Sequence, residues 1–196
     1  MRVAAIAWRP PVLALAAAII LLADARANDV TLEERLQLCG TCHGADGNSR
    51  MEKIPSLAGQ PELMLVNQLI FMREGVRPIE AMAPFVKDLK DGEIEALAKH
   101  YANAMPQRSD ESIDPALVAR GAALAAQRRC AACHGTDLAG RDQIPRIAKQ
   151  RVDYLIVSLT RFRDRPHPSA DTIMSGSVAG LPNADLAALA HYAASR

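Results

Sequence analysis

The sequence has few aromatic residues: they make up 4% of its 196 residues, and only one is tryptophan. A small domain with so few large rings has difficulty building a core from its own side chains. The sequence also lacks a basic run and a phosphate-cradling glycine loop, and its formal charge is only +1. We therefore expect no nucleic-acid partner. We also expect a group other than the side chains to contribute to the core.

Long apolar runs are missing too, apart from one near the start. Residues 12–23 are uninterruptedly apolar, follow Arg2 and Arg9, and precede the small-x-small pattern Ala25-Arg26-Ala27. This is the arrangement of a secretory signal peptide, and the run is shorter than the roughly 20 apolar residues that cross a bilayer. The pattern predicts a cleaved signal peptide over residues 1–27, with an uncleaved N-terminal anchor as the alternative.

The four cysteines lie in two C-x-x-C-H motifs, and other features repeat with them. Cys39, Cys42 and His43 recur as Cys130, Cys133 and His134, a shift of 91. Further pairs recur at shifts of 90 to 92: Pro55 with Pro145, Gln60 with Gln150, and Met82 with Met174. The chain therefore contains two copies of one unit. We place the first domain at 28–104, a polar linker with two prolines close by at 105–114, and the second domain at 115–196.

Within each copy the spacing of apolar residues predicts helices rather than strands. Residues 61–74 place apolar side chains on one helical face, and so do the residues that follow a capping Asp91. Asp114 followed by Pro115 predicts the start of another helix. We expect an all-α fold with three short helices per unit, joined by long loops that wrap around something.

Four interpretations of the cysteine pairs compete. Zinc knuckles would need closer pairs, because Cys42 and Cys130 are 88 positions apart where roughly 15 to 20 is usual. A thioredoxin-type pair needs a strand and a helix around it, and a disulfide within C-x-x-C gains little from loop closure. C-x-x-C-H is also the attachment signal for c-type haem, and two equivalent copies behind a signal peptide favour this interpretation.

Haem attachment explains the spacing of the motif. The two cysteines reach the two vinyl-derived carbons on one side of the porphyrin, and the next residue then falls beneath the iron. His43 and His134 are therefore predicted to bind iron through a neutral ring nitrogen. Two covalently bound haem c groups would also supply the missing core.

Methionine is the common second axial ligand of an electron-carrying haem. Met174 is the only methionine after His134, and its counterpart in the repeat is Met82. The separations agree, since Met82 lies 39 positions after His43 and Met174 lies 40 positions after His134. We therefore predict that Met82 and Met174 complete the two iron sites.

Other histidines and methionines have simpler interpretations. Met64 and Met72 lie on the predicted middle helix and are expected to pack. His100 and His191 are expected at the surface or in packing, with bis-histidine ligation as the alternative. His167 is expected to face solvent.

Two prolines are candidates for holding the ligand histidines in place. Pro55 lies 12 residues after His43, and Pro145 lies 11 after His134. A ligand histidine usually donates its other N–H to a carbonyl, which fixes the ring and tunes the metal. A proline loop would present such a carbonyl rigidly; the alternative is that these prolines only stiffen the loop.

Three stretches, CGTCHGADGNS, IPSLAGQ and MAPFVKDLKDGEIEALAKHY, resemble the cytochrome c4 family of two-haem class I c-type cytochromes. The resemblance covers essentially the whole chain after residue 27. It implies two tandem all-α class I cytochrome c domains, each wrapped around one covalent haem, with the two haems face to face. It also implies iron ligation by His43 with Met82 and by His134 with Met174, with histidine N–H groups bonded to the carbonyls of Pro55 and Pro145.

The sequence departs from the family pattern at two places. The family has a glycine nine positions before the first haem cysteine, where its first and last helices cross. Gly121 holds this position in the second unit, but Val30 holds it in the first, so we expect a short first helix there. The stretch RDRPHPSADTIM adds two residues before Met174, which predicts a different loop and two different reduction potentials.

The preferred hypothesis is a periplasmic electron carrier rather than an enzyme, because histidine and methionine would fill both axial positions. The resemblance implies redox partner proteins, such as a cytochrome bc1-type complex or a membrane-bound terminal oxidase, and at most peripheral membrane association. The alternative is the haem subunit of an oxidoreductase such as a flavocytochrome sulfide dehydrogenase. A third hypothesis, a two-haem enzyme of peroxidase or thiosulfate-oxidising type, needs a vacant axial position.

Overall fold

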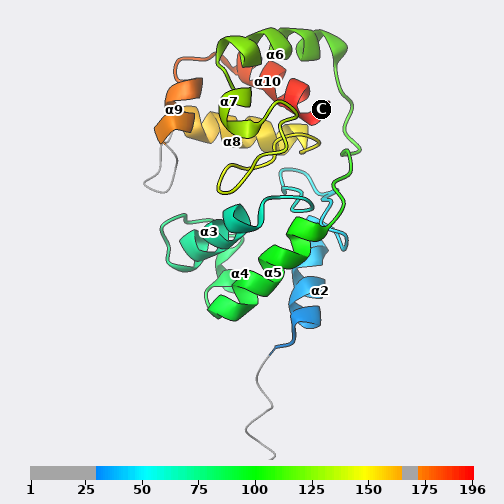
Figure 1. The fold of residues 1–196 in the computed structure, drawn as a ribbon, viewed down its shortest axis with the longest axis vertical. Coiled ribbons are helices and arrows are strands. Elements are labelled where there is room, and N and C mark those ends of the chain that lie inside the picture. The colour runs from blue at the N-terminus through cyan, green and yellow to red at the C-terminus, as the bar shows by residue number, and fades with distance from the viewer. Residues whose placement is uncertain (1–29, 165–171) are drawn as a thin grey trace, which may run out of the picture. The chain divides into compact units, whose positions relative to one another are not determined.

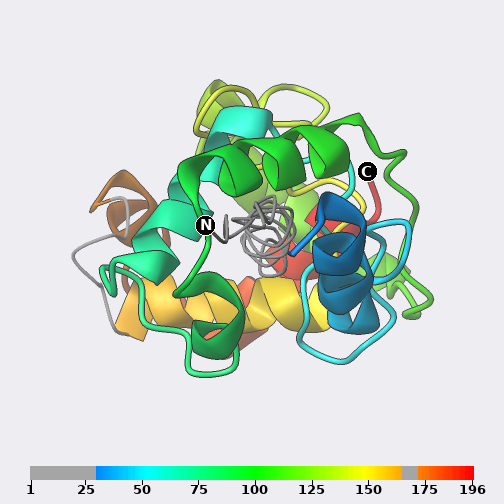
Figure 2. The same cartoon turned by 90° about the horizontal axis from the view of Figure 1, so that it is seen from below.

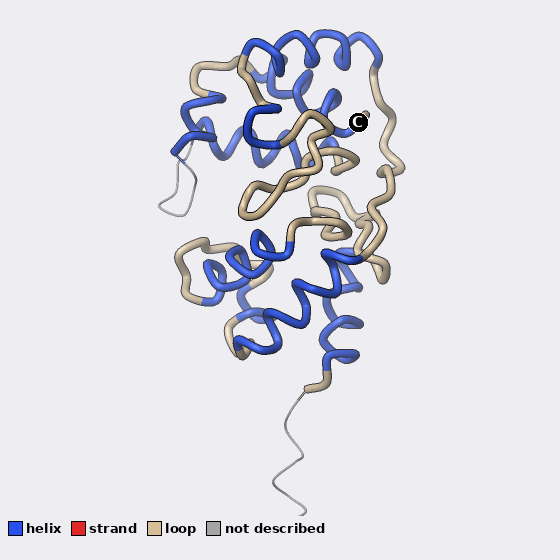
Figure 3. The backbone as a smooth tube through the Cα atoms, in the orientation of Figure 1, coloured by secondary structure: helices blue, strands red, loops and turns tan. Residues whose placement is uncertain are grey.

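A computed structural model describes residues 30–164 and 172–196. The predicted signal peptide over residues 1–27 and the predicted position of His167 lie outside these ranges. The described residues form helices and loops without a strand, apart from an isolated β-bridge between Arg141 and Ile144 (Figure 3). The predicted all-α class is confirmed. No helix in the described ranges combines the length and the apolar character needed to cross a membrane.

In the first half of the chain the helices over residues 62–73 and 91–103 follow the predicted apolar spacing. The helices of this half are α2 (Leu32–His43), α3 (Glu62–Arg73), α4 (Ala83–Val86) and α5 (Asp91–Asn103), labelled in Figure 1. The prediction that Asp91 caps α5 is wrong by one residue, because the N-cap is Lys90. Its backbone N–H donates to the Glu93 carboxylate at 2.8 Å, and Asp91 becomes the first helical residue, where a negative charge suits the helix dipole.

The second half repeats the pattern with more short pieces. Its helices are α6 (Pro115–Gln127), α7 (Ala131–His134), α8 (Val152–Asp164), α9 (Thr172–Val178) and α10 (Asn183–Ala194). Asp114 caps α6 as predicted, since its carboxylate accepts the backbone N–H groups of Ala116 and Leu117 at 2.8 and 3.4 Å. The short helices α4, α7 and α9 were not predicted, because four to seven residues carry too little periodicity.

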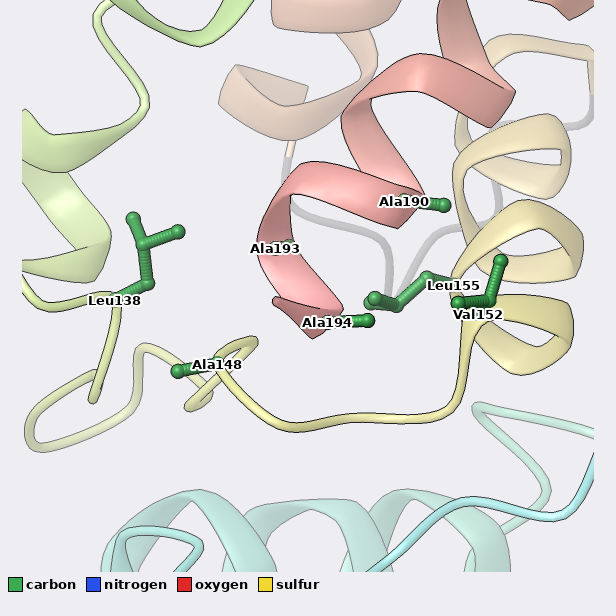
Figure 4. Packing of buried hydrophobic residues seen from close by; sticks show 7 residues of the cluster. All are labelled: Leu138, Ala148, Val152, Leu155, Ala190, Ala193 and Ala194. Atoms are coloured by element: carbon green, nitrogen blue, oxygen red, sulfur yellow. The ribbon is translucent and has the colours of Figure 1, made fainter. Parts of the chain in front are cut away.

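Buried apolar residues in each half form small clusters of aliphatic side chains. One cluster packs α8 against α10, and Figure 4 shows it: Leu138, Ala148, Val152, Leu155, Ala190, Ala193 and Ala194. Three of these residues are alanines on α10, so the two helices approach closely but bury little side-chain volume. The shortage of large rings in the sequence thus appears as thin cores that leave packing to another group.

Helices α6 and α10 cross at the glycine that the sequence singles out. A Cβ added at Gly121 would lie 2.0 Å from the backbone oxygen of Ala188, so only glycine fits there. In the first half, α2 begins at Leu32, two residues after Val30. It has 12 residues, as many as α3, so the expectation of a short helix is not met. It lies beside α5 in both views (Figures 1 and 2), and the Arg35–Glu93 ion pair at 2.9 Å joins them.

The segment between α5 and α6 bonds to both halves of the chain. Asn48 donates to the backbone oxygen of Met105 at 3.0 Å and accepts the backbone N–H of Gln107 at 2.8 Å. On the other side, the Glu111 carboxylate accepts the first backbone N–H groups of α8, from Val152 and Asp153. We propose residues 105–114 as the linker between two domains, held in one path by these bonds.

Replacing Gly121 with alanine should destabilise the second half, because the new methyl group would overlap the backbone of α10. We expect a loss of about 1–3 kcal/mol in the free energy of unfolding, as at other overpacked sites, measured by denaturant titration followed by circular dichroism. The control is Gly92→Ala on α5, where an added Cβ meets no atom within 4 Å. Equal unfolding midpoints for the two variants would contradict a tight crossing at Gly121.

Candidate functional site

Each C-x-x-C-H motif lies at the end of a helix. Cys39, Cys42 and His43 occupy the last turns of α2 at spacings of three and four residues, which places them on one face. The helix ends at His43 because Gly44 takes a positive φ of 85°, a conformation that suits glycine. In the second half α7 ends at His134, and Gly135 takes φ 84°.

A loop then returns towards the histidine in both halves. In the first half the backbone N–H groups of Leu57 and Ala58 donate to the carbonyl oxygen of Gly47 at 2.7 and 3.0 Å. In the second half those of Ile147 and Ala148 donate to Leu138 at 3.0 and 3.1 Å. The two loops therefore share one hydrogen-bond pattern, and this pattern carries a proline back to each motif.

Both predicted histidine–proline hydrogen bonds are present. His43 Nδ1 lies 2.8 Å from the Pro55 carbonyl oxygen, and His134 Nδ1 lies 2.8 Å from that of Pro145. A carbonyl oxygen only accepts, so Nδ1 carries the proton and Nε2 carries the lone pair that binds metals. Burial lowers the pKa of His43, against the opposing effect of the Pro55 bond, and this favours the neutral imidazole that a metal needs.

The surroundings of the cysteines argue against the zinc and disulfide interpretations. Burial raises the pKa of the Cys39 and Cys130 thiols, whereas zinc binds the thiolate. These two residues also contact different hydrophobic clusters, one in each half. The four cysteines form no disulfide with one another, and the described part of the chain holds no group of three metal-binding His, Cys, Asp or Glu side chains.

Each candidate methionine contacts the same cluster as a motif cysteine of its own half. Met82, at the start of α4, packs with Cys39 against the cluster of Val86, Leu89, Ile94 and Leu97. Met174, on α9, packs with Cys130 against the cluster of Ala125, Val178, Leu181, Leu186 and Leu189. Met64 and Met72 pack on α3 as expected, although Met72 contacts the same cluster as Met82. In both halves, therefore, the candidate methionine and a motif cysteine pack against one shared cluster.

The remaining described histidines have structural surroundings. His100 is exposed on α5 and makes an edge contact with the ring of Tyr101 at 5.2 Å. His191 is half-buried on α10, and its Nδ1 accepts the backbone N–H of Asp114 at 3.2 Å. His191 therefore holds the start of α6, in agreement with a packing role.

A buried arginine provides a test of whether a haem fits. Arg146 is 4% exposed, and its guanidinium donates to the carbonyl oxygens of Ala58, at 2.7 Å, and Ala148. Its Nε is buried without a hydrogen-bond partner, and no acidic side chain among the described residues pairs with Arg146. Burial lowers its pKa to about 10. An unpaired buried cation is costly, and haem propionates are carboxylates of the kind that would pair with it. The residues present therefore fit a haem.

Sequence reasoning missed the contacts that join the two halves near these histidines. Gln60 bonds the backbone of Arg146, and Gln150 bonds the backbone of Ser56. Arg151 is 5% exposed and donates to the backbone oxygen of Ser49 in the first half at 3.4 Å. It also pairs with Asp110 of the connecting segment at 3.1 Å. The repetition of glutamine at a shift of 90 was a visible signal for the first two residues, whereas nothing in the sequence marks Arg146 as buried.

Comparison with known proteins matches both halves. Residues 118–195 match the family model described as cytochrome c, and residues 34–101 match the model described as cytochrome c oxidase, cbb3-type, subunit III. Cytochrome c4 from Pseudomonas aeruginosa is 32% identical over 182 residues, which span 87% of this chain and 90% of that protein.

A solved structure and a further curated protein are also similar to this chain. The crystal structure of reduced recombinant cytochrome c4 from Pseudomonas stutzeri superposes with a TM-score of 0.74 at 29% identity, covering 84% of this chain and 98% of that one. The thiosulfate dehydrogenase electron acceptor from Thiomonas intermedia is 30% identical over 141 residues, which span 64% of this chain and 63% of that protein.

Replacing Arg146 with methionine tests the fit of the buried guanidinium. If a propionate pairs with it, removing the cation leaves a buried carboxylate alone, and we expect the haem-loaded protein to lose about 3–5 kcal/mol of unfolding free energy. Denaturant titration of that protein measures the loss. The control is Arg141→Met, an exposed site in the same loop, which should change stability little. A more stable Arg146→Met variant would show that no acidic group meets Arg146.

Proposed function

The chain belongs to the cytochrome c4 family, and we propose that it shuttles electrons in the periplasm between redox proteins of a respiratory chain, towards a terminal oxidase. It is a two-haem electron carrier with two covalently bound haem c groups. The observation that carries the proposal is the repeated site, in which a buried histidine, a proline carbonyl and a methionine recur together.

At each site, different residues of this chain attach the haem and bind its iron. Two cysteines hold the porphyrin by thioether bonds: Cys39 and Cys42 in the first domain, Cys130 and Cys133 in the second. His43 and His134 offer Nε2 to iron because Pro55 and Pro145 hold the proton on Nδ1. Met82 and Met174 would each supply a sulfur ligand. The bound haem supplies one-electron exchange between ferric and ferrous iron.

This arrangement suits electron transfer better than catalysis. If a histidine and a methionine both bind each iron, neither site would leave a position for a substrate. The surrounding aliphatic clusters exclude water, which favours reduced iron and limits the rearrangement that accompanies a change of charge. The signal-peptide pattern over residues 1–27 supports a periplasmic location. The periplasm is also where c-type haem attachment is expected.

A second function is supported by the similarity to the thiosulfate dehydrogenase electron acceptor from Thiomonas intermedia. On this hypothesis the same two haems would accept electrons from one oxidoreductase, as a subunit or a dedicated acceptor. The haem chemistry would be unchanged, and only the electron donor would differ. The two functions are therefore distinguished by partners and not by the iron sites.

Axial ligation by methionine is tested with optical spectroscopy of the oxidised protein. Met82→Ala and Met174→Ala should each abolish half of the weak far-red band of sulfur–iron bonding and lower the potential of one haem, since methionine raises it. The matched control is Met72→Leu, which contacts the same cluster as Met82 and should keep the whole band. Loss of the band in the control, or its survival in both test variants, would refute the ligand assignment.

Direction of electron flow is tested with the reduced protein and respiratory membranes. We expect membrane vesicles that contain a terminal oxidase to reoxidise it in an oxygen-dependent reaction, because the carrier would then deliver its electrons. The comparison is reduction of the oxidised protein by thiosulfate together with a thiosulfate dehydrogenase. Rapid reduction there, combined with no reoxidation by vesicles, would contradict the respiratory proposal and support the second function.

A further inference from the structure

Two buried glutamines bind the backbone of the opposite half in the same way. Gln150 accepts the backbone N–H of Ser56 at 2.8 Å and donates to the backbone oxygen of the same residue at 2.8 Å. Gln60 accepts the backbone N–H of Arg146 at 3.0 Å and donates to its oxygen at 2.8 Å. Both glutamines are almost completely buried, at 2% and 5% exposure, so these bonds are shielded from water.

The peptide groups that these glutamines bind are the ones that hold the motif histidines. The N–H of Ser56 and the carbonyl of Pro55 belong to one peptide group, and that carbonyl accepts from His43 Nδ1. A continuous line of hydrogen bonds therefore runs from the histidine of the first half, through one peptide, to Gln150 of the second half.

The mirror arrangement starts from the second half. His134 Nδ1 donates to the carbonyl of Pro145, and the N–H of the same peptide group, on Arg146, donates to Gln60. We call each of these two lines of hydrogen bonds a relay. Each relay crosses from one half to the other, and the two relays run in opposite directions. The repetition makes an accidental contact a poor explanation, because the same two positions of the repeat are used twice.

The order of these bonds has an electronic consequence. An acceptor on the N–H of a peptide polarises the group, so its carbonyl oxygen becomes a stronger acceptor. A stronger acceptor at Nδ1–H makes the imidazole more basic as a ligand. A more basic ligand stabilises ferric iron and lowers the reduction potential, since hydrogen bonding around a haem ligand sets that potential.

We propose that each glutamine is a positioning residue that tunes the haem of the opposite domain: Gln150 acts through the Pro55–Ser56 peptide on His43, and Gln60 acts through the Pro145–Arg146 peptide on His134. The proposal rests on the assignment of His43 and His134 as iron ligands. It makes contact between the domains a determinant of both potentials, because separating the domains would break both relays together.

The test exchanges each glutamine for leucine in the haem-loaded protein and measures both potentials by spectroelectrochemical titration. Gln150→Leu should raise the potential of the first haem, with about a three- to tenfold change in its reduction equilibrium. This is smaller than the roughly 10- to 100-fold loss of metal affinity or activity that follows removal of a ligand's direct partner. The second haem should change by less than about twofold. Gln60→Leu is the matched control and should give the mirror result.

A merely structural role gives a different pattern. Loosening of the contact between the halves would admit water to both sites and lower both potentials. A joint decrease, a shift of the haem in the mutated half, or no shift of either haem would each overturn the proposal.

A second variant keeps the acceptor oxygen and covers the case in which the leucine variants do not accumulate. Gln150→Glu still offers an oxygen to the Ser56 N–H, so the first haem should stay at or below its wild-type potential; a rise like that expected for leucine would overturn the proposal.

Nuclear magnetic resonance of the reduced protein gives an independent readout. The Nδ1–H signal of His43 should move upfield in Gln150→Leu while that of His134 stays, and the reverse outcome or equal shifts would overturn the relay.

The wild-type protein separates this inference from the proposed function. Two histidine-ligated haems in its optical and resonance spectra establish the ligands on which the relay depends, whatever the glutamine variants do. Unchanged potentials in those variants would then reject the relay alone and leave the electron carrier standing.

Discussion

The described structure depends on one peptide group in each half that is hydrogen-bonded through both its C=O and its N–H. In the first half this group joins Pro55 to Ser56, and in the second half it joins Pro145 to Arg146. Its carbonyl fixes the ring of the motif histidine at 2.8 Å, and its N–H is held by a glutamine from the other half. The loop that carries it cannot shift without losing one of these buried bonds, each of which is costly to leave unmade. The same peptide group therefore positions the motif histidine and takes part in the contact between the halves.

The hydrophobic core of each half is small. Each half buries small aliphatic clusters, and α10 contributes alanines where larger side chains would be expected. Such small clusters leave part of each core to be completed by another apolar group. Arg146 is buried between carbonyl oxygens with its Nε unpartnered, which suits the carboxylates at the edge of a haem. Packing and electrostatics in the described residues therefore both fit the prosthetic group that the motifs attach.

Much of this was visible in the sequence, and the reasons for the remainder are physical. The repeat located the motif histidines, the prolines and the two methionines, and apolar spacing placed α3 within one residue of its observed bounds, Glu62–Arg73. The helices α4 and α9 around the methionines are four and seven residues long, too short for a periodic signal. The glutamine bonds join residues 94 and 86 positions apart. Such distant pairs depend on how the halves meet, which local spacing does not encode.

The most direct measurement is a crystal structure of the purified, haem-loaded protein with diffraction recorded at the iron absorption edge. The account requires two iron peaks, one between His43 Nε2 and the Met82 sulfur and the other between His134 Nε2 and the Met174 sulfur, with thioether bonds to all four cysteines. A single iron peak, a zinc signal between the cysteine pairs, or an iron with a vacant axial position would contradict it.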